Sequence, residues 1–234
     1  MYSAIIFLIC MKQKRFTALS ILELITFASM LFGLISIFTD FRFMVDLPRL
    51  ASIPFLTTYT GLSNLFIGVV CLLCALYRII YKVDKLPKWL FIIKLVFISQ
   101  ITITFFITAL YLSPQLGADW WMLYNNAGLF NHLITPLLAI IHFLFLERKV
   151  EIKWYMCFYS LIPIVLYAVL YITNVFTHLN PDGSTSTTYD IYGFFRFGGG
   201  YFILFLIGFF IIAFGICLLY RLENIAINKR KDNE

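Results

Sequence analysis

The sequence predicts an all-α integral membrane protein, a bundle of six transmembrane helices in one domain over residues 1–234. Of the 234 residues, 62% are hydrophobic and only 13% are charged. The mean hydropathy is +0.90, too apolar for a soluble domain. Six apolar runs are each about 20 residues or longer, the length that a helix needs to cross a ~30 Å hydrocarbon layer.

The six runs follow one another from the basic segment near the N-terminus to the basic tail. The residues before them, 1–11, are apolar but too short to span a bilayer, and they lack the basic start and small-residue cleavage site of a signal peptide. Translation from Met1 or from Met11 both fit the pattern. By apolar length alone, we place the helices at residues 17–38, 55–77, 89–112, 127–146, 154–176 and 198–220.

Basic residues alternate between the two sides of the predicted bundle. The side with both termini has Lys12, Lys14, Arg15, Arg78, Lys82, Lys85, Lys88, Arg148, Lys149, Lys153, Arg221, Lys229, Arg230 and Lys231. The opposite side has only Arg42, Arg49 and Arg196, and Lys94 falls inside a helix. Because cytoplasmic loops are rich in Lys and Arg, we expect both termini in the cytoplasm.

The composition also narrows the function classes. The net charge of +6 comes from these short basic clusters, so it reports topology and not nucleic-acid binding, and no nucleic-acid module is present. All five cysteines fall in apolar runs, which argues against a disulfide framework. We expect no metal and no cofactor, and the sequence does not assign an oligomeric state.

The second and fourth helices carry polar residues near the outer surface. In the second, small and polar residues recur at spacings of three and four, including Thr60, Ser63 and Asn64. Thr60 and His132 each lie about five residues in from the outer helix end, roughly 7–8 Å below the surface if the helices are straight. The two side chains are therefore expected to meet.

A hydroxyl beside a neutral imidazole is the minimal pair for nucleophilic attack on an ester. At this depth a lipid in the outer leaflet presents its carbonyl, so we predict Thr60 as nucleophile and His132 as general acid and base. Ser63 and Asn64 would orient the pair or the oxyanion. The alternative is a polar helix contact of about 1 kcal/mol that needs no substrate.

Two segments resemble the motif helices of a known family. FLTTYTGLSN, with Thr60 ahead of Ser63 and Asn64, and NHLITP, with His132 before Pro136, are similar to the androgen-induced and androgen-dependent multipass membrane hydrolases and their bacterial six-span relatives. In the animal members a threonine and a histidine cleave fatty acid esters of hydroxy fatty acids. The resemblance implies the same roles for Thr60 and His132, a lipid or lipid-like small molecule as partner, and a bacterial plasma membrane.

A second set of ionisable residues is expected near the inner surface. Glu23, Lys94 and His142 lie about four to six residues from the inner ends of the first, third and fourth helices. A Glu23–Lys94 ion pair beside His142 would satisfy these costly groups. It would be either a structural contact or the proton relay of a small transporter. A scaffold or ligand-binding protein without chemistry is the third hypothesis.

The longest outer loop, residues 177–197, is rich in turn formers. It is either a roof over the outer mouth of the bundle or an ordinary connector. Tyr159, Tyr167 and Tyr171 in the fifth helix either line a lipid-sized cavity or pack in the core.

Overall fold

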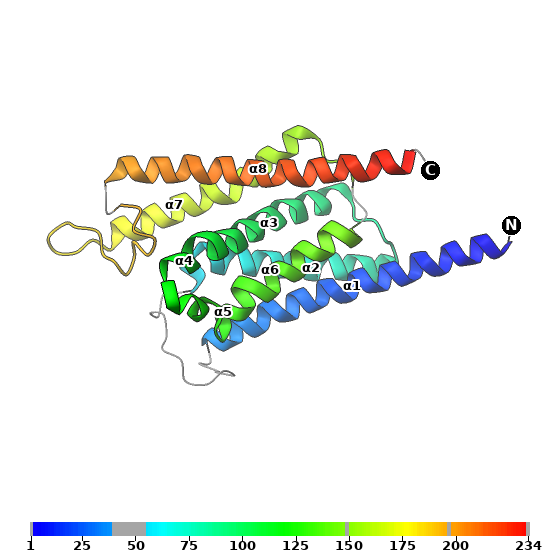
Figure 1. Cartoon of the computed structure of the whole chain (residues 1–234), viewed down its shortest axis with the longest axis horizontal. Coiled ribbons are helices and arrows are strands. Elements are labelled where there is room, and N and C mark those ends of the chain that lie inside the picture. The colour runs from blue at the N-terminus through cyan, green and yellow to red at the C-terminus, as the bar shows by residue number, and fades with distance from the viewer. Residues whose placement is uncertain (1, 39–54, 148–149, 196–197, 233–234) are drawn as a thin grey trace.

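The structure is a computed structural model that describes residues 2–38, 55–147, 150–195 and 198–232. Within those ranges it describes side chains from residue 17 to residue 227, apart from that of Phe55. The predictions about the basic N-terminal cluster and the start methionine therefore lie outside the described side chains. Long helices run side by side, with both termini at one end (Figure 1). We name this the terminal end and the opposite one the loop end.

The predicted all-α membrane fold is confirmed. The described residues form helices and turns without a strand. Six helices are long and apolar enough to cross a membrane: Thr17–Phe38, Tyr59–Tyr81, Lys88–Gln115, Ala127–Leu146, Trp154–Thr177 and Gly199–Ile227. The first belongs to α1 (Tyr2–Phe38) and the last to α8 (Gly199–Asp232). The fourth predicted range agrees with its span to the residue, and the first span ends at Phe38 as predicted.

The second helix begins and ends later than predicted. A short 3-10 turn, η1 (Phe55–Thr57), precedes α2 (Tyr59–Tyr81). The Thr58 hydroxyl accepts the Gly61 N–H at 2.9 Å and so caps the first turn. At the other end Lys82 adopts a left-handed conformation and its N–H is donated to the Arg78 carbonyl. Arg78, predicted in a cytoplasmic loop, is therefore a buried helical residue.

The third and fourth spans are not continuous α-helices. In the third span, α3 (Lys88–Ile107) passes through the π-helical turn η2 (Thr108–Leu112) into α4 (Ser113–Gln115), and the 3-10 helix η3 (Gly117–Tyr124) follows. The fourth span is divided into α5 (Ala127–Leu129), η4 (Phe130–Ile134), α6 (Thr135–Ile141) and η5 (His142–Leu146), where η4 and η5 are π-helical.

The fifth span also changes type along its length, from the 3-10 helix η6 (Trp154–Leu161) to α7 (Ile162–Thr177). The core joins α2, α3 and the fourth span, with Ile67, Phe91 and Phe143 completely buried. Gly68 lets α1 approach α2, because a Cβ there would lie 2.5 Å from the Met30 methyl group.

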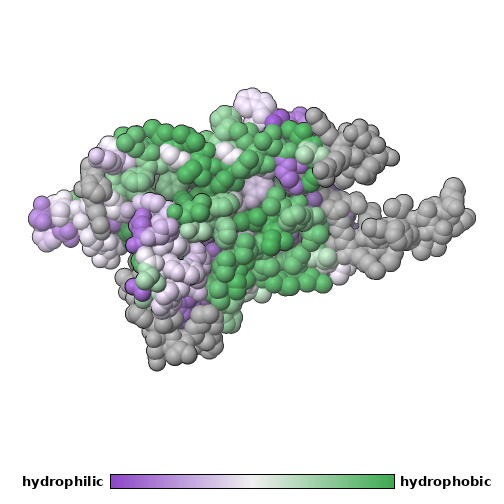
Figure 2. All heavy atoms as spheres, in the orientation of Figure 1, coloured by the Kyte–Doolittle hydropathy of each residue, from purple (hydrophilic) through white to green (hydrophobic). Residues whose placement is uncertain are grey.

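Apolar side chains cover much of the outer surface between the two ends. Figure 2 shows this hydrophobic band across the helices, with hydrophilic residues gathered at the loop end. On α8, Leu204, Ile211 and Leu219 are each about two-thirds exposed. Large exposed apolar faces are unfavourable in water but are matched by lipid, so this surface agrees with an integral membrane protein.

Candidate functional site

A cavity of about 730 Å³ lies at the loop end between the third span, α7 and α8. Its lining is mainly aliphatic and aromatic, and it includes the side chains of Tyr167 and Tyr171, two of the three tyrosines considered for a lipid-sized cavity. Three threonines, Thr60, Thr104 and Thr108, supply hydroxyl groups to the wall. The cavity therefore combines a large apolar volume with a small polar wall, as ligand pockets do.

His132 contacts one of these threonines directly. Its Nδ1 lies 3.0 Å from Oγ1 of Thr108, which is within the reach of general-base catalysis. His132 is half-buried, whereas Thr108 is almost completely buried and is one of the residues that line the cavity. A hydroxyl on the cavity wall is thus hydrogen-bonded to an imidazole behind it.

Both residues of this pair lie in π-helical turns, η4 for His132 and η2 for Thr108. Prolines explain the turns. Pro136 has no N–H for the carbonyl of His132 and its ring would clash with that carbonyl, while Pro114 does the same to Leu110. The helices respond with wider bonds, from Thr135 N–H to the Phe130 carbonyl and from Ser113 N–H to the Thr108 carbonyl. Such π-turns are frequent at functional sites.

Side chains next to the pair hold its geometry. The Ser113 hydroxyl is 2.8 Å from the Thr108 carbonyl and 3.2 Å from the Tyr124 hydroxyl. The Tyr124 ring stands edge-on to the His132 ring, with centroids 6.5 Å apart. Gly128 allows η3 to come this close, because a Cβ there would lie 2.3 Å from the Leu123 carbonyl oxygen.

Thr60 lines the same cavity, in the first turn of α2. In the described part of the chain no hydrogen bond joins its hydroxyl to His132, whose ring nitrogen bonds Thr108. Thr60 lies instead beside Tyr192. The structure therefore places Thr108, and not the predicted Thr60, against the imidazole of His132. Thr108 was visible in the sequence as part of a polar row with Gln100 and Thr104.

Ser63 and Asn64 support the site from behind. The Ser63 hydroxyl is 2.8 Å from that of Thr104 and 3.0 Å from the Thr60 carbonyl. Asn64 is completely buried, and its Nδ2 donates to the carbonyls of Thr60 and Asn131, both at 2.9 Å. Both amide hydrogens are therefore in use, and the contact positions η4 next to His132. The geometry suits an orienting role better than an oxyanion donor.

The loop between α7 and α8 folds over the cavity. Of its two predicted roles, this agrees with a roof over the outer mouth of the bundle and not with an ordinary connector. Residues 191–194 line the cavity, and the Tyr192 hydroxyl accepts the Tyr59 N–H at 3.1 Å. Asp190 is buried, where its carboxylate accepts the Tyr171 hydroxyl and the Phe195 N–H. Burial raises the pKa of Tyr192, although hydrogen bonds from Tyr59, Tyr167 and Thr60 oppose the increase. We name residues 190–195 the roof.

The predicted Glu23–Lys94 ion pair is present, with Lys94 Nζ 2.6 Å from the Glu23 carboxylate. Two residues missed in the sequence complete it. The Arg78 guanidinium is 3.2 Å from Glu23 and also pairs with Glu147, which is 2.5 Å from Lys94 Nζ. All four side chains are fully buried. We name Glu23, Arg78, Lys94 and Glu147 the charge quartet.

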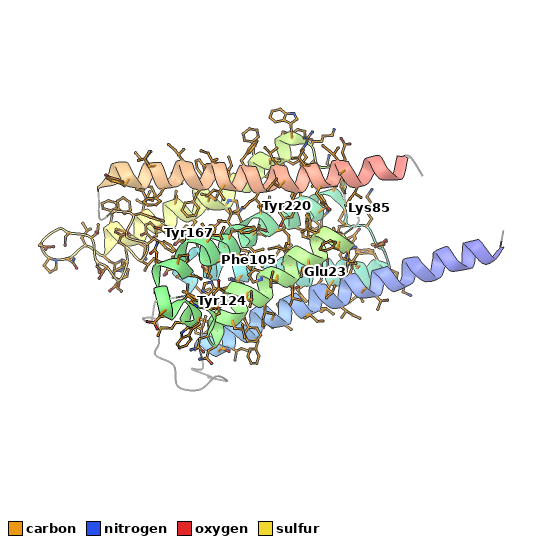
Figure 3. All side chains as sticks on the ribbon, viewed as in Figure 1. Glu23, Lys85, Phe105, Tyr124, Tyr167 and Tyr220 are labelled. Carbon is orange, nitrogen blue, oxygen red and sulfur yellow. The ribbon has the colours of Figure 1, made fainter. Side chains whose placement is uncertain are left out.

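His142 lies near the charge quartet, but among the described residues no hydrogen bond joins its ring to any member of the quartet. Its Nε2 is 3.6 Å from the Cys71 thiol. Figure 3 shows the separation of the two polar regions, with Tyr124 and Tyr167 toward the loop end and Glu23 toward the terminal end. Among the described residues, no group of three or more His, Cys, Asp and Glu side chains is placed to hold a metal ion.

Comparison with known proteins identifies no relative, because no family model, no curated protein and no solved structure matches the chain.

Proposed function

We propose that this protein is a membrane-embedded hydrolase of lipid esters, with His132 as general acid and base. The single observation that supports it is the His132–Thr108 contact of 3.0 Å at the wall of a largely apolar cavity. The alternation of basic residues supports a loop end in the outer leaflet and cytoplasmic termini. The resemblance of the motif segments supports a bacterial plasma membrane.

In the proposed reaction the threonine Oγ1 attacks the ester carbonyl carbon while its proton moves to Nδ1 of His132. The resulting imidazolium then donates this proton to the leaving alkoxide, which departs as an alcohol. Water next attacks the threonine ester, losing its proton to His132, and the acid product leaves as the threonine recovers its proton. The cycle consumes one ester and one water.

The geometry and the family resemblance favour different nucleophiles. Thr108 has its hydroxyl next to the imidazole, whereas Thr60 carries the position that the family motif implies. We propose Thr108 as the hydroxyl that His132 activates, and Thr60 as a second hydroxyl that contacts the substrate from the α2 side of the cavity. In the described part of the chain no carboxylate contacts His132, so the pair acts without the third member of a triad.

The test uses purified protein in lipid vesicles that contain fluorogenic long-chain esters, with His132→Ala, Thr108→Ala and Thr60→Ala compared with wild type. We expect the first two changes to lower ester hydrolysis by roughly 10²–10⁴-fold, with the thermal midpoint little changed. Thr60→Ala should have a smaller effect. If Thr60→Ala abolishes hydrolysis and Thr108→Ala does not, Thr60 is the nucleophile. Hydrolysis that survives His132→Ala contradicts the proposal.

The transporter hypothesis receives less support. Each carboxylate of the charge quartet bonds both cations, so two negative and two positive charges form a closed set. A proton relay needs a group that can release its partner, whereas each of these carboxylates is held by two cations at once. We therefore assign the quartet a structural role.

A further inference from the structure

The walls of the loop-end cavity are unequally buried. On the α7 side, Ile164, Ala168 and Tyr171 are buried, and above the cavity the roof residues that line it, 191–194, are half-buried. The opposite wall is different, since Tyr111 in η2 and Tyr201 and Leu204 in α8 are 54%, 52% and 65% exposed. The cavity thus opens toward the side of the bundle, between η2 and the loop-end half of α8.

That side is the surface that faces lipid. Leu110 next to the opening is 72% exposed, and Ile203 and Ile207 beside the α8 rim are 58% and 48% exposed. Such apolar exposure belongs in hydrocarbon and not in water. The aqueous side, in contrast, is covered by the roof, which the Asp190–Tyr171 and Tyr192–Tyr59 bonds attach to α7 and α2.

The lining also restricts the ligand. Among the described residues that line the cavity, none is Asp, Glu, Lys, Arg or His. A charged headgroup would therefore be buried without a partner, which is costly. An uncharged ester or hydroxyl group, however, would meet the threonine hydroxyls, and an alkyl chain would meet Phe202, Phe205 and Phe209.

We propose that the cavity binds one neutral single-chain lipid, which enters sideways from the bilayer between η2 and the loop-end half of α8. The chain lies against Gly208 and the phenylalanines of α8, and its uncharged polar end lies at the threonine wall. This inference builds on the cavity of the proposed function, but it concerns binding and entry and does not require that the ligand be cleaved.

Two glycines of α8 supply a matched pair of variants. Gly208 lines the cavity and Gly215, two turns further along, does not, yet an added Cβ meets nothing within 4 Å at either position. Gly208→Phe should place a ring in the cavity, and Gly215→Phe places the same ring on the same helix outside the cavity.

The probe is an ether-linked monoalkylglycerol with a diazirine in the middle of its chain, which cannot be hydrolysed as an ester. A phospholipid with the same diazirine reports ordinary contact with surrounding lipid. With full-length protein in vesicles, we expect the glycerol probe to label η2 and residues 201–212. Gly208→Phe should lower this labelling by roughly tenfold or more, as a filled pocket excludes its ligand, and Gly215→Phe should not. Equal labelling of the two variants, or the same labelled peptides with both probes, overturns the proposal.

Entry is tested by the rate of labelling. Leu204→Trp should slow it several-fold by narrowing the opening, whereas Leu219→Trp, at an equally exposed position of α8 away from the cavity, should not. If Leu204→Trp has no effect and opening the roof with Tyr171→Phe accelerates labelling, the lipid enters from the aqueous side and the lateral route is wrong. If the protein is labelled normally but hydrolyses no ester, the proposed hydrolase function is wrong and the lipid-binding proposal stands.

Discussion

The two polar regions of this bundle satisfy their buried groups in opposite ways. At the terminal end, two carboxylates and two cations from distant parts of the chain are fully buried and bond one another. At the loop end, neutral groups bond in pairs, Thr108 with His132 and Thr104 with Ser63, and the threonine of each pair lines a cavity of about 730 Å³. The comparison separates polar residues that stabilise the bundle from those that are free to meet a ligand.

Electrostatics explains the difference. A buried charge without a partner costs several kcal/mol, so each charge of the quartet is held by two opposite charges. A neutral hydrogen bond between transmembrane helices contributes only about 0.6 kcal/mol on average. Hydroxyls such as those of Thr60 and Thr108 can therefore face a cavity at small cost. Four predictions test this contrast, in order of decreasing effect.

The largest effect is expected from Lys94→Met in the charge quartet. The change leaves two carboxylates facing one guanidinium, so we expect the free energy of unfolding to fall by about 3–5 kcal/mol. Unfolding in mixed micelles measures the loss. Adding Glu147→Gln to Lys94→Met should restore part of the stability, because the negative charge of Glu23 and the positive charge of Arg78 then balance. A double variant no more stable than Lys94→Met would contradict a closed quartet.

A smaller effect is expected for Asn64→Ala. The native asparagine side chain connects α2 to η4. Losing the two bonds from Nδ2 to the Thr60 and Asn131 carbonyls should lower stability by about 1–2 kcal/mol. Ester hydrolysis should fall together with it, since these bonds position the segment that carries His132. Thermal unfolding and vesicle hydrolysis are compared on the same preparation. Lost stability with full hydrolysis would show that the contact does not position the histidine.

Pro136→Ala should affect geometry more than stability. An N–H at this position can bond the carbonyl of His132, which favours regular α-helix over the π-turn η4 and turns the imidazole away from Thr108. We expect hydrolysis to fall by roughly tenfold, as misorientation of a catalytic group predicts, without loss of stability. A Pro163→Ala variant in α7 provides the control. Unchanged hydrolysis in Pro136→Ala would mean that the π-turn is not needed.

The smallest effect is expected at Ser29, whose hydroxyl is 2.7 Å from that of Thr135 in a neutral contact between α1 and α6. Ser29→Ala should cost at most about 1 kcal/mol, the scale of a single interhelical hydrogen bond, and should leave hydrolysis unchanged. Thermal unfolding measures the stability and vesicle hydrolysis measures the activity, both on the same preparation. A loss as large as that of Lys94→Met would remove the distinction between neutral and charged contacts.

The sequence alone predicted the parts of the molecule that depend on local composition. Apolar run length predicted six spans, and the cost of isolated charges in lipid predicted the Glu23–Lys94 pair. Boundaries were less predictable because apolar length does not reveal caps. The Thr58 cap and the left-handed Lys82 displaced α2 by four residues, and this shift is why Arg78 was missed.

Only the tertiary structure decided which groups face one another. The depth comparison that paired Thr60 with His132 assumed straight helices, but a π-turn adds one residue and rotates the following side chains by about 100°. In the structure His132 lies within the π-turn η4 and Thr108 lies against its imidazole, whereas Thr60 lines the cavity beside Tyr192. Sequence determines which residues enter the membrane, since each residue's transfer into lipid is a local property. Their partners depend on the packing and distortion of several helices at once.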